Sequence, residues 1–411
     1  MLARLPLHLA RLRFTIFIHN RRIAQGDEVV IMSKRACGVA LLSLLILMQM
    51  AAAGCSGEPE QVQFGAILSM QGSAAPYGNA IWKGVQLATE LVNERGGVDV
   101  GGRGTRVPLV VHLRDCKSDP LLGIQQAQEL IGLGVQAVIG SDSSDVTLGM
   151  APIFEESEVI LMSPSSSSPK ITDAGEYIYR NYPSDSLEAV NLANHIYNVD
   201  GIQEVAIIAS QSEFGLGTKN SFIARFRSLG GTILAEETFP PDAQDYTTQV
   251  AGVAAVDPPA VYIAAYSFRT GAVARALRDA GVDARLYGTG ATRPENTVQT
   301  GGEAVEGLVF PAPAFEPDLD APYMRMFISE FRERFGDTFD IYAAQGYDAV
   351  NILVQAIEQM GTRPEDMRFY LNTMNPFEGV AGSTVFDDNG DVRKYHHMYV
   401  IRDGVAVPFD R

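Results

Sequence analysis

One stretch of the sequence has a spacing that could belong to a covalent catalyst, Ser167-Ser168-Pro169-Lys170. It satisfies the S-x-x-K pattern of serine acyl-enzymes, in which the two side chains lie on one helical turn and S-D-N and K-T-G elements complete the site. Neither element occurs in the chain, and a proline interrupts the motif. The pattern therefore does not predict catalysis.

Other sets of reactive side chains are equally incomplete. The sequence has no G-x-S-x-G, no G-x-G-x-x-G and no P-loop. Its six histidines lack metal-ligand spacing, and the adjacent His396 and His397 would point to opposite faces of a strand. Asp387, Asn389 and Asp391 match part of a calcium loop, but the glycine is misplaced and the terminal glutamate is missing, so a hairpin turn explains them better. We therefore expect no enzyme activity, no metal and no cofactor.

Two serine-rich loops carry more information. Each follows an apolar run: "SDSSDVT" comes after "VIG", and "PSSSSPKIT" comes after "ILMS". In open α/β sheets, ligands bind at the carboxyl ends of strands, where helix N-termini present free backbone N–H groups. A single hydroxyl in such a place often caps a helix. Two such loops after successive strands predict a cleft that holds an anion.

The elements that position these loops alternate along the chain. Apolar strand candidates such as "VQFGAILS", "EVAIIAS" and "PAVYIAAYS" are separated by amphipathic helix candidates such as "GAVARALRDAG". This alternation predicts parallel sheets covered on both faces. Roughly 350 residues follow the N-terminal segment, which is too many for one such sheet, so two α/β lobes are expected.

Composition limits the class of partner. The chain of 411 residues is 46% hydrophobic, which is typical of a globular protein. Its formal net charge is -17 and it lacks a long basic cluster, which argues against a nucleic-acid partner.

The N-terminal region has the pattern of an export signal. From Met32, Lys34 and Arg35 precede an apolar run that is too short to span a bilayer and that ends in "AAGC" at Cys55. This end resembles a bacterial lipoprotein signal, although Ala52 replaces the usual leucine; a plain signal peptide cleaved nearby is the alternative.

These features predict the boundaries of the N-terminal segments. We expect a signal peptide at 32–54, lipid attachment at Cys55 and a tether at 55–61. Residues 1–31 do not fit in front of such a signal, so they are predicted to be a mis-assigned extension, with translation starting at Met32. The exported protein would be lipid-anchored, in the periplasm or at the outer face of the cell membrane.

Six segments occur in an order and spacing shared with a known family. They are "GAILSMQGSAAPYGNAIWKGVQLATELVNERGGV", "RDCKSDPLLGIQQAQELI", "VQAVIGSDSSDVT", "ILMSPSSSSPKIT", "YAAQGYDAVNIL" and "FDDNGD". From about Val62 onward, the chain resembles the type I periplasmic binding proteins of the leucine/isoleucine/valine-binding group, which feed ABC importers. The resemblance implies two doubly wound α/β lobes joined by three crossovers, with the ligand in the cleft between them. Lobe 1 would comprise 62–180 and 313–383, and lobe 2 would comprise 181–312 and 384–411.

The resemblance also implies roles for individual residues. Ser144 takes the position whose hydroxyl and N–H meet the ligand carboxylate, and Ser167 takes a threonine position that holds the same carboxylate. Ser166 takes the position whose backbone carbonyl meets the ligand amine. Tyr77 matches an aromatic residue at the cleft mouth, and Tyr266 matches a tyrosine of the second lobe. An aromatic residue at each edge would cover an apolar ligand side chain.

The chain departs from the family pattern in three places. Gly290 stands where the family has the acid that binds the ligand ammonium, and Phe214 replaces a tyrosine of the second lobe. Ser118 and Ser143 occupy the places of a first-lobe disulfide.

Loss of the acid matters most, because an ammonium buried without a counter-charge is unfavourable. Asp142, Asp145 or Glu295 could substitute for it, or the ligand lacks an amine.

The expected function follows from this resemblance. The chain would be the lipid-anchored solute-binding component of an ABC importer for a small carboxylate-bearing ligand, by default a branched-chain or other apolar amino acid. An amide, urea-like or aromatic-acid ligand remains open, as does a sensory lipoprotein without a transport role. The expected partners are the importer's permease and, through Cys55, the membrane.

Overall fold

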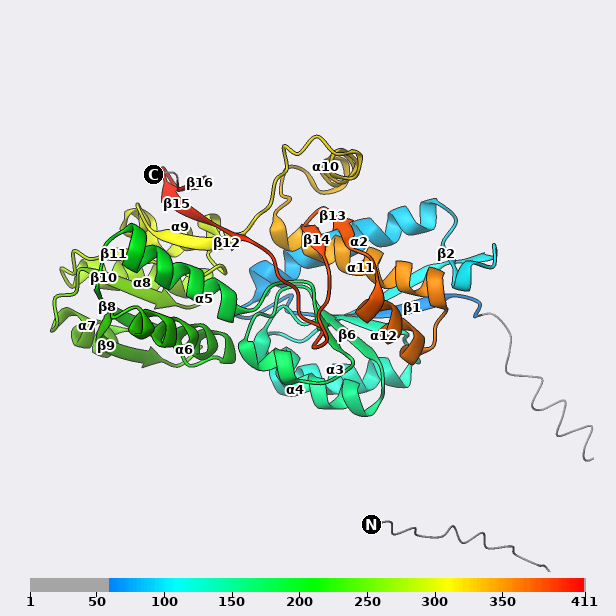
Figure 1. The fold of residues 1–411 in the computed structure, drawn as a ribbon, viewed down its shortest axis with the longest axis horizontal. Helices are drawn as coiled ribbons and strands as arrows, with labels where there is room; N and C mark the ends of the chain where they lie inside the picture. Colours follow the sequence, from blue (N-terminus) through cyan, green and yellow to red (C-terminus); the bar gives the residue numbers. More distant parts are fainter. Residues whose placement is uncertain (1–58, 410–411) are drawn as a thin grey trace, which may run out of the picture. The chain divides into compact units, whose positions relative to one another are not determined.

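Two main β-sheets organise residues 59–409, the part of the chain that the computed structural model describes (Figure 1). The upstream segment 1–31, the signal peptide and Cys55, all discussed above, lie outside the described residues. Between residues 59 and 409, no helix is both long enough and apolar enough to cross a membrane.

The first sheet, in lobe 1, has five parallel strands in the order β4-β1-β5-β6-β7. Every residue of β5 and β6 is buried. Burial on both faces explains why β5 and the first three residues of β6 form continuous apolar runs rather than alternating ones. The strands are β1 (Val62–Leu68), β4 (Leu109–Asp115), β5 (Ala137–Gly140), β6 (Ile160–Ser163) and β7 (Ile178–Arg180).

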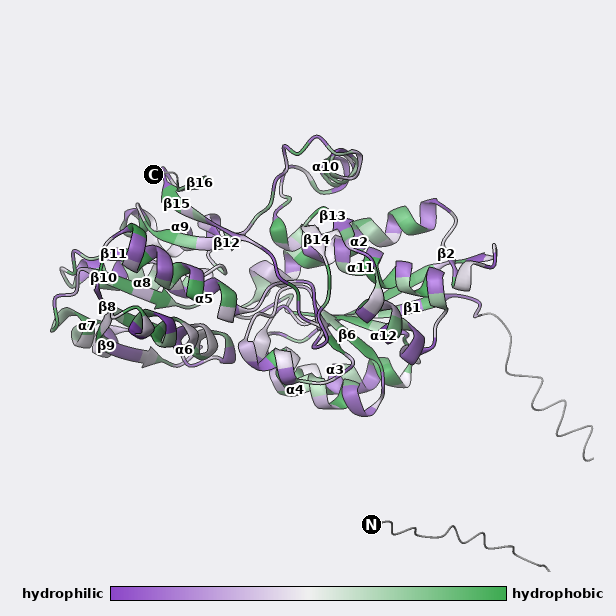
Figure 2. Cartoon of the chain, viewed as in Figure 1, coloured by the Kyte–Doolittle hydropathy of each residue, from purple (hydrophilic) through white to green (hydrophobic). Residues whose placement is uncertain are grey.

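The second sheet, in lobe 2, has the order β16-β15-β12-β11-β10-β8-β9, in which β15 and β16 are antiparallel and the other strands are parallel. The edge strand β9 carries Glu236 and Glu237 and is coloured hydrophilic in Figure 2, as suits a strand open to solvent along one side. The strands are β8 (Glu204–Ser210), β9 (Thr232–Phe239), β10 (Ala260–Ala264), β11 (Arg285–Tyr287), β12 (Val309–Pro313), β15 (His396–Arg402) and β16 (Val405–Pro408).

Helices cover both sheets, so the prediction of two α/β lobes with parallel sheets is confirmed. Lobe 1 contains α2 (Ala75–Glu94), α3 (Pro120–Gly132), α4 (Ser144–Glu156), α10 (Pro322–Phe335), α11 (Ile341–Met360) and α12 (Pro364–Thr373). Lobe 2 contains α5 (Asp185–Asn194), α6 (Glu213–Ser228), α7 (Thr247–Ala254), α8 (Ser267–Asp279) and α9 (Pro294–Gly301).

The helices α2 and α11 pack closely in lobe 1 because each has a glycine at the contact. A Cβ atom added at Gly84 would overlap the Ala343 carbonyl oxygen, and one added at Gly346 would overlap the carbonyl oxygen of Ile81. Larger residues at either position would force the two helices apart. In this pair, α2 also contacts β1, and α11 contacts β5, so the two helices pack together on the first sheet.

The chain passes between the two sheets three times. It leaves the first sheet after β7, and it returns to lobe 1 after β12 to form α10, α11, α12 and a short hairpin of β13 (Phe377–Gly379) and β14 (Gly382–Thr384). It enters the second sheet again as β15.

Residues 384–394, which the resemblance predicts to belong to lobe 2, pack against lobe 1. The Phe386 ring lies edge-on to Tyr179, with 5.2 Å between centroids, and Asp391 forms an ion pair with the buried Arg180 at 2.6 Å. Because a buried guanidinium requires a carboxylate partner, this segment stays with lobe 1, and we place the third crossing after Lys394.

Candidate functional site

A small cavity lies where the carboxyl ends of the two sheets meet, and both lobes contribute to its wall. Its volume of about 10 Å³ is enough for about one water molecule. A larger ligand therefore enters only if the lobes separate or the rings on the wall turn. The wall consists of five aromatic rings, two carboxylates, two serines and one alanine: Tyr77, Tyr182, Phe214, Tyr266, Tyr342, Asp142, Glu188, Ser165, Ser167 and Ala291.

The aromatic rings of the wall contact one another in sequence. Phe214 stacks on Tyr266 with centroids 4.7 Å apart, and Tyr77 lies 5.4 Å from Tyr266 and 4.9 Å from Tyr342. Tyr182 stacks on Tyr342 at 6.1 Å. The structure thus brings together the three aromatic residues selected from the sequence, and it adds Tyr182 and Tyr342, which sequence reasoning missed.

Two of these tyrosines also connect the lobes by hydrogen bonds. The Tyr77 hydroxyl lies 2.6 Å from the Ala291 carbonyl oxygen, to which it donates, and it accepts the Ser267 N–H at 3.0 Å. The Tyr342 hydroxyl donates to the Gly290 carbonyl oxygen at 3.0 Å. Burial raises the pKa of Tyr77 to about 12, so its hydroxyl stays protonated and can donate at any physiological pH.

The serine loops of lobe 1 are bonded mainly to each other. The Ser144 Oγ accepts the N–H groups of Ser167 and Ser168, each at 3.2 Å. The Ser166 hydroxyl donates to the Ser141 carbonyl oxygen at 2.8 Å. Of the three serines selected from the sequence, only Ser167 lies on the cavity wall, whereas Ser144 and Ser166 are buried and do not line it.

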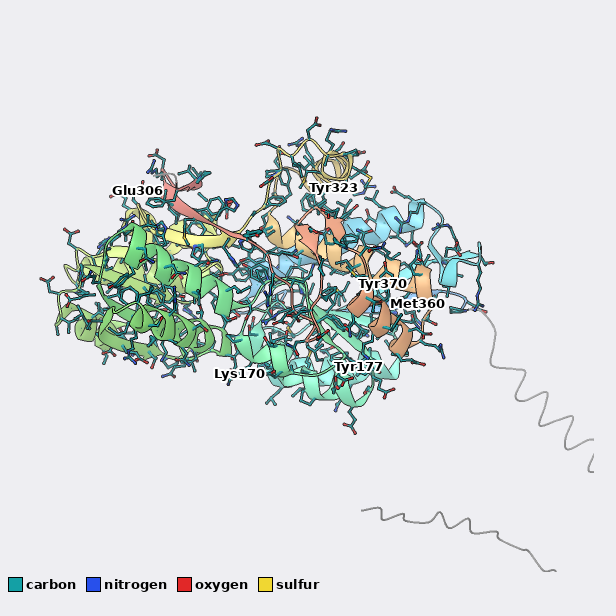
Figure 3. All side chains as sticks on the ribbon, in the orientation of Figure 1. Lys170, Tyr177, Glu306, Tyr323, Met360 and Tyr370 are labelled. Carbon is teal, nitrogen blue, oxygen red and sulfur yellow. The ribbon has the colours of Figure 1, made fainter. Side chains whose placement is uncertain are left out.

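Lys170 does not face the serines that precede it in the sequence. Its ammonium pairs with Glu213 of lobe 2 at 2.7 Å, and its side chain extends from the surface in Figure 3. Ser168 instead caps the short helix of Pro169–Asp173 by accepting the Lys170 N–H. The S-x-x-K spacing is thus a capped turn rather than a nucleophile and its base.

Three acids were considered from the sequence as substitutes for an acid at Gly290, and the structure separates them. Asp142 lies on the cavity wall, where burial raises its pKa to about 6; Oδ1 accepts the Ser69 N–H at 2.6 Å, and Oδ2 has no partner. Asp145 accepts the Glu213 N–H at 3.0 Å, at the N-terminus of α6. Glu295 lines a separate surface groove.

The second acid on the wall, Glu188, was not considered from the sequence. It lies in the first turn of α5, is 2% exposed, and its Oε1 accepts the Gly290 N–H at 2.7 Å. A Cβ atom added at Gly290 would overlap Glu188 Oε2 and lie 2.8 Å from Cδ. The Glu188 carboxylate therefore fills the space that a side chain at position 290 would need.

The surroundings of Glu188 set its charge. Burial, followed by the neighbouring Asp185 carboxylate, raises the pKa of Glu188 well above its ordinary value, and burial raises the pKa of Asp185 to about 7. The His396 Nε2 atom lies 3.9 Å from Glu188 Oε2, and burial lowers the pKa of this imidazole to about 4. Because His396 is neutral at physiological pH, it does not neutralise the acid pair.

A sequence signal for this acid pair does exist. Asp185 and Glu188 lie three apart, on the same helical face as the buried Ala189 and Leu192. Charged residues on an apolar helical face are rarely accidental.

Among residues 59–409, no group of three or more histidine, cysteine or acidic side chains is arranged to bind a metal.

Comparisons with known proteins agree with this geometry. The family described as "Periplasmic binding protein" matches residues 61–403. A leucine-, isoleucine-, valine-, threonine- and alanine-binding protein of Pseudomonas aeruginosa is 26% identical over 327 residues, which cover 79% of this chain and 85% of that protein.

Two solved structures are similar in fold. A leucine-binding protein of Thermotoga maritima superimposes with a TM-score of 0.78 and 28% identity, covering 85% of this chain and 98% of that one. A solute-binding protein of an ABC transporter from Rhodopseudomonas palustris, in complex with 3,4-dihydroxybenzoic acid, has a TM-score of 0.73 and 20% identity, covering 86% of this chain and 98% of that one.

Proposed function

The chain belongs to the periplasmic binding proteins, the solute-binding proteins of ABC transporters, and from this premise we propose that it binds a small carboxylate-bearing ligand, by default a branched-chain or other apolar amino acid, between its lobes. It is a binding protein rather than an enzyme. The observation that carries the proposal is the cavity itself, in which aromatic rings from both lobes enclose a space beside the serine loops.

The two ends of such a ligand would meet different parts of the wall. The helix α4 begins at Ser144 beside the serine loops, so its N-terminal N–H groups and the Ser167 hydroxyl would hold the carboxylate. The rings of Phe214 and Tyr266 would cover the apolar side chain. Tyr77 and Tyr342, which bond across the cleft, would then favour the form in which the lobes meet.

A thermal-shift screen tests this proposal. The chain from Pro59 onward, which forms one compact unit, is exposed to amino acids, amides, urea-like solutes and aromatic acids. A ligand at a hundred times its Kd stabilises the folded protein by about 2.7 kcal/mol. We expect apolar amino acids to raise the melting temperature. A shift with amides or urea-like solutes alone would contradict the amino-acid assignment.

The proposed anchor requires its own experiment. We propose that Cys55 carries a lipid, because "AAGC" follows a short apolar run. The native protein should incorporate a fatty-acid label and partition into detergent, and the Cys55→Ser variant should do neither. Label retained in Cys55→Ser would contradict lipid attachment at this cysteine.

A further inference from the structure

The cavity wall carries two acidic side chains and no basic one. Among its described residues, Asp142 comes from lobe 1 and Glu188 from lobe 2, and none is lysine, arginine or histidine. The nearby Arg180 already pairs with Asp391 at 2.6 Å. A carboxylate in a closed space without a positive partner is unfavourable. A ligand that carries a positive charge would supply the partner that the wall lacks.

The position of Glu188 is fixed from two sides. The Gly290 N–H donates to Oε1 at 2.7 Å, and the helix α5 holds the side chain in its first turn, where the positive end of the helix dipole favours a carboxylate. Its neighbour Asp185 is held in turn by the bond from its own N–H to the Ser167 carbonyl oxygen at 2.8 Å. This arrangement aligns the lobe 2 acid with the serine loop of lobe 1.

The absence of a side chain at position 290 is part of the same arrangement. A Cβ atom there would overlap Glu188 Oε2, so any residue except glycine would displace the carboxylate. An acid at position 290 would project from the loop after β11 into the same space. The chain thus places a carboxylate there from α5 instead of from the loop.

Resting on the proposed function, we infer that Glu188 binds the ammonium group of the ligand and makes the site selective for amines over amine-free acids. Asp142 is the second acid on the wall, with its Oδ2 lacking a partner, and it contributes from the opposite lobe. A cation held between acids of the two lobes favours the form in which the lobes meet. An amine-free aromatic acid would instead add a third carboxylate to a wall without positive charge.

The first test uses L-leucine and 4-methylpentanoate, which differ in the ammonium group. We expect wild-type protein to bind leucine at least a hundredfold more tightly. Glu188→Gln, which keeps the shape and removes the charge, should weaken leucine at least a hundredfold and leave 4-methylpentanoate unchanged or tighter. Glu295→Gln is the matched control, since Glu295 lines a separate surface groove, and it should bind leucine as wild type does.

The second test exchanges the two positions. Gly290→Ala should weaken leucine at least tenfold, because the new methyl group displaces the Glu188 carboxylate. The double variant Glu188→Ala/Gly290→Glu restores a carboxylate from the loop, and it should bind leucine at least tenfold more tightly than Glu188→Ala alone. Folding of each variant is checked by its thermal transition.

The outcomes separate this inference from the proposed function. If Glu188→Gln binds leucine as wild type does, or if wild type binds 4-methylpentanoate as tightly as leucine, the inference is wrong and the cleft function stands. If no compound of the screen, including leucine and 4-methylpentanoate, stabilises wild type, the proposed function fails and the inference fails with it.

Discussion

The two walls of the cavity use their polar groups in different ways. In lobe 1, the hydroxyls of Ser144 and Ser166 are occupied by bonds within and between the serine loops. In lobe 2, Glu188 accepts one backbone N–H, lies 3.9 Å from His396 Nε2 and borders the cavity. The serines that stand out in the sequence thus bond to one another beside the cavity, whereas an acid within an ordinary helix supplies one of the two carboxylates of the wall, the other being Asp142.

The largest expected effect concerns the support of the lobe 1 wall. The buried Arg180 donates to the Ser168 carbonyl oxygen at 2.8 Å and pairs with Asp391. Arg180→Met would leave Asp391 without its partner, and the free energy of unfolding should fall by about 3–5 kcal/mol in chemical denaturation.

Arg332→Met is the matched control, because Arg332 forms a half-exposed ion pair with Asp337. It should change the free energy of unfolding by less than about 1 kcal/mol. Equal stability of Arg180→Met and wild type would show that Arg180 does not hold the serine loop.

The next effect distinguishes the walls directly. Ser144→Ala removes the acceptor of two buried N–H groups, so the free energy of unfolding should fall by about 1–3 kcal/mol. The exposed Ser228→Ala is the control and should be neutral. If Ser144→Ala abolished ligand binding at unchanged stability, Ser144 would be a ligand contact and the contrast between the walls would be wrong.

The acids at and beside the cavity predict a pH dependence of binding. In the free protein, Asp142, Asp185 and Glu188 have raised pKa values, about 6 for Asp142 and about 7 for Asp185. An ammonium favours the ionised form of Glu188, so binding releases a proton. Affinity should therefore rise with pH until Glu188 is ionised in the free protein as well, by up to about tenfold per unit for each proton released.

The stability of the free protein should change in the opposite direction. The folded state retains protons that the unfolded chain has lost, so stability falls as pH rises from about 4 to about 7. Calorimetry of ligand binding in two buffers of different ionisation enthalpy measures the number of protons that binding releases, and thermal unfolding at several pH values measures the change in stability. His396 offsets part of this fall between about pH 4 and pH 6.5, because burial lowers its pKa to about 4 and the unfolded imidazole binds a proton there that the folded one does not. The raised pKa values of Tyr182 and of Tyr262, a buried residue of β10, keep both tyrosines out of this range. An affinity that falls with rising pH would contradict an ammonium at Glu188.

The smallest expected effect lies at the rim, where Lys170 of lobe 1 pairs with Glu213 of lobe 2. The lysine side chain is 68% exposed, so solvent screens the pair. Lys170→Ala should weaken ligand binding less than about fivefold at low salt and not measurably at high salt. A hundredfold loss of ligand affinity would show that the main contact between the lobes is this rim pair and not the tyrosines.

Much of the fold could be predicted because burial leaves a pattern along the chain. The run that became β5 is apolar, as are the first three residues of β6, and the serine loops follow both strands directly. The resemblance selected Tyr77, Phe214, Tyr266 and Ser167, all of which the structure places on the cavity wall. Tyr182 and Tyr342 were missed because Tyr182 follows β7 and Tyr342 lies in the first turn of α11, and only the packing of the folded chain brings these two segments to the cavity.

Glu188 could not be placed from the sequence for a related physical reason. It lies 102 residues before Gly290, and only the folded second sheet brings the first turn of α5 to the loop after β11. The sequence showed that position 290 lacks an acid, but it did not show that the carboxylate of Glu188 fills the space beside it. The same limit applied to the third crossing, since the pairing of Asp391 with Arg180 depends on three-dimensional packing.

The overlap between Glu188 and any side chain at position 290 constrains how this site could have evolved. If an ancestor carried an acid at position 290, an acid at 188 could not have adopted its present orientation until that side chain was lost. The two changes are therefore epistatic: the benefit of the second depends on the first. A lineage making this exchange one residue at a time would pass through a protein with a weakened preference for amines, and such an intermediate could be diverted to acids that carry no amine.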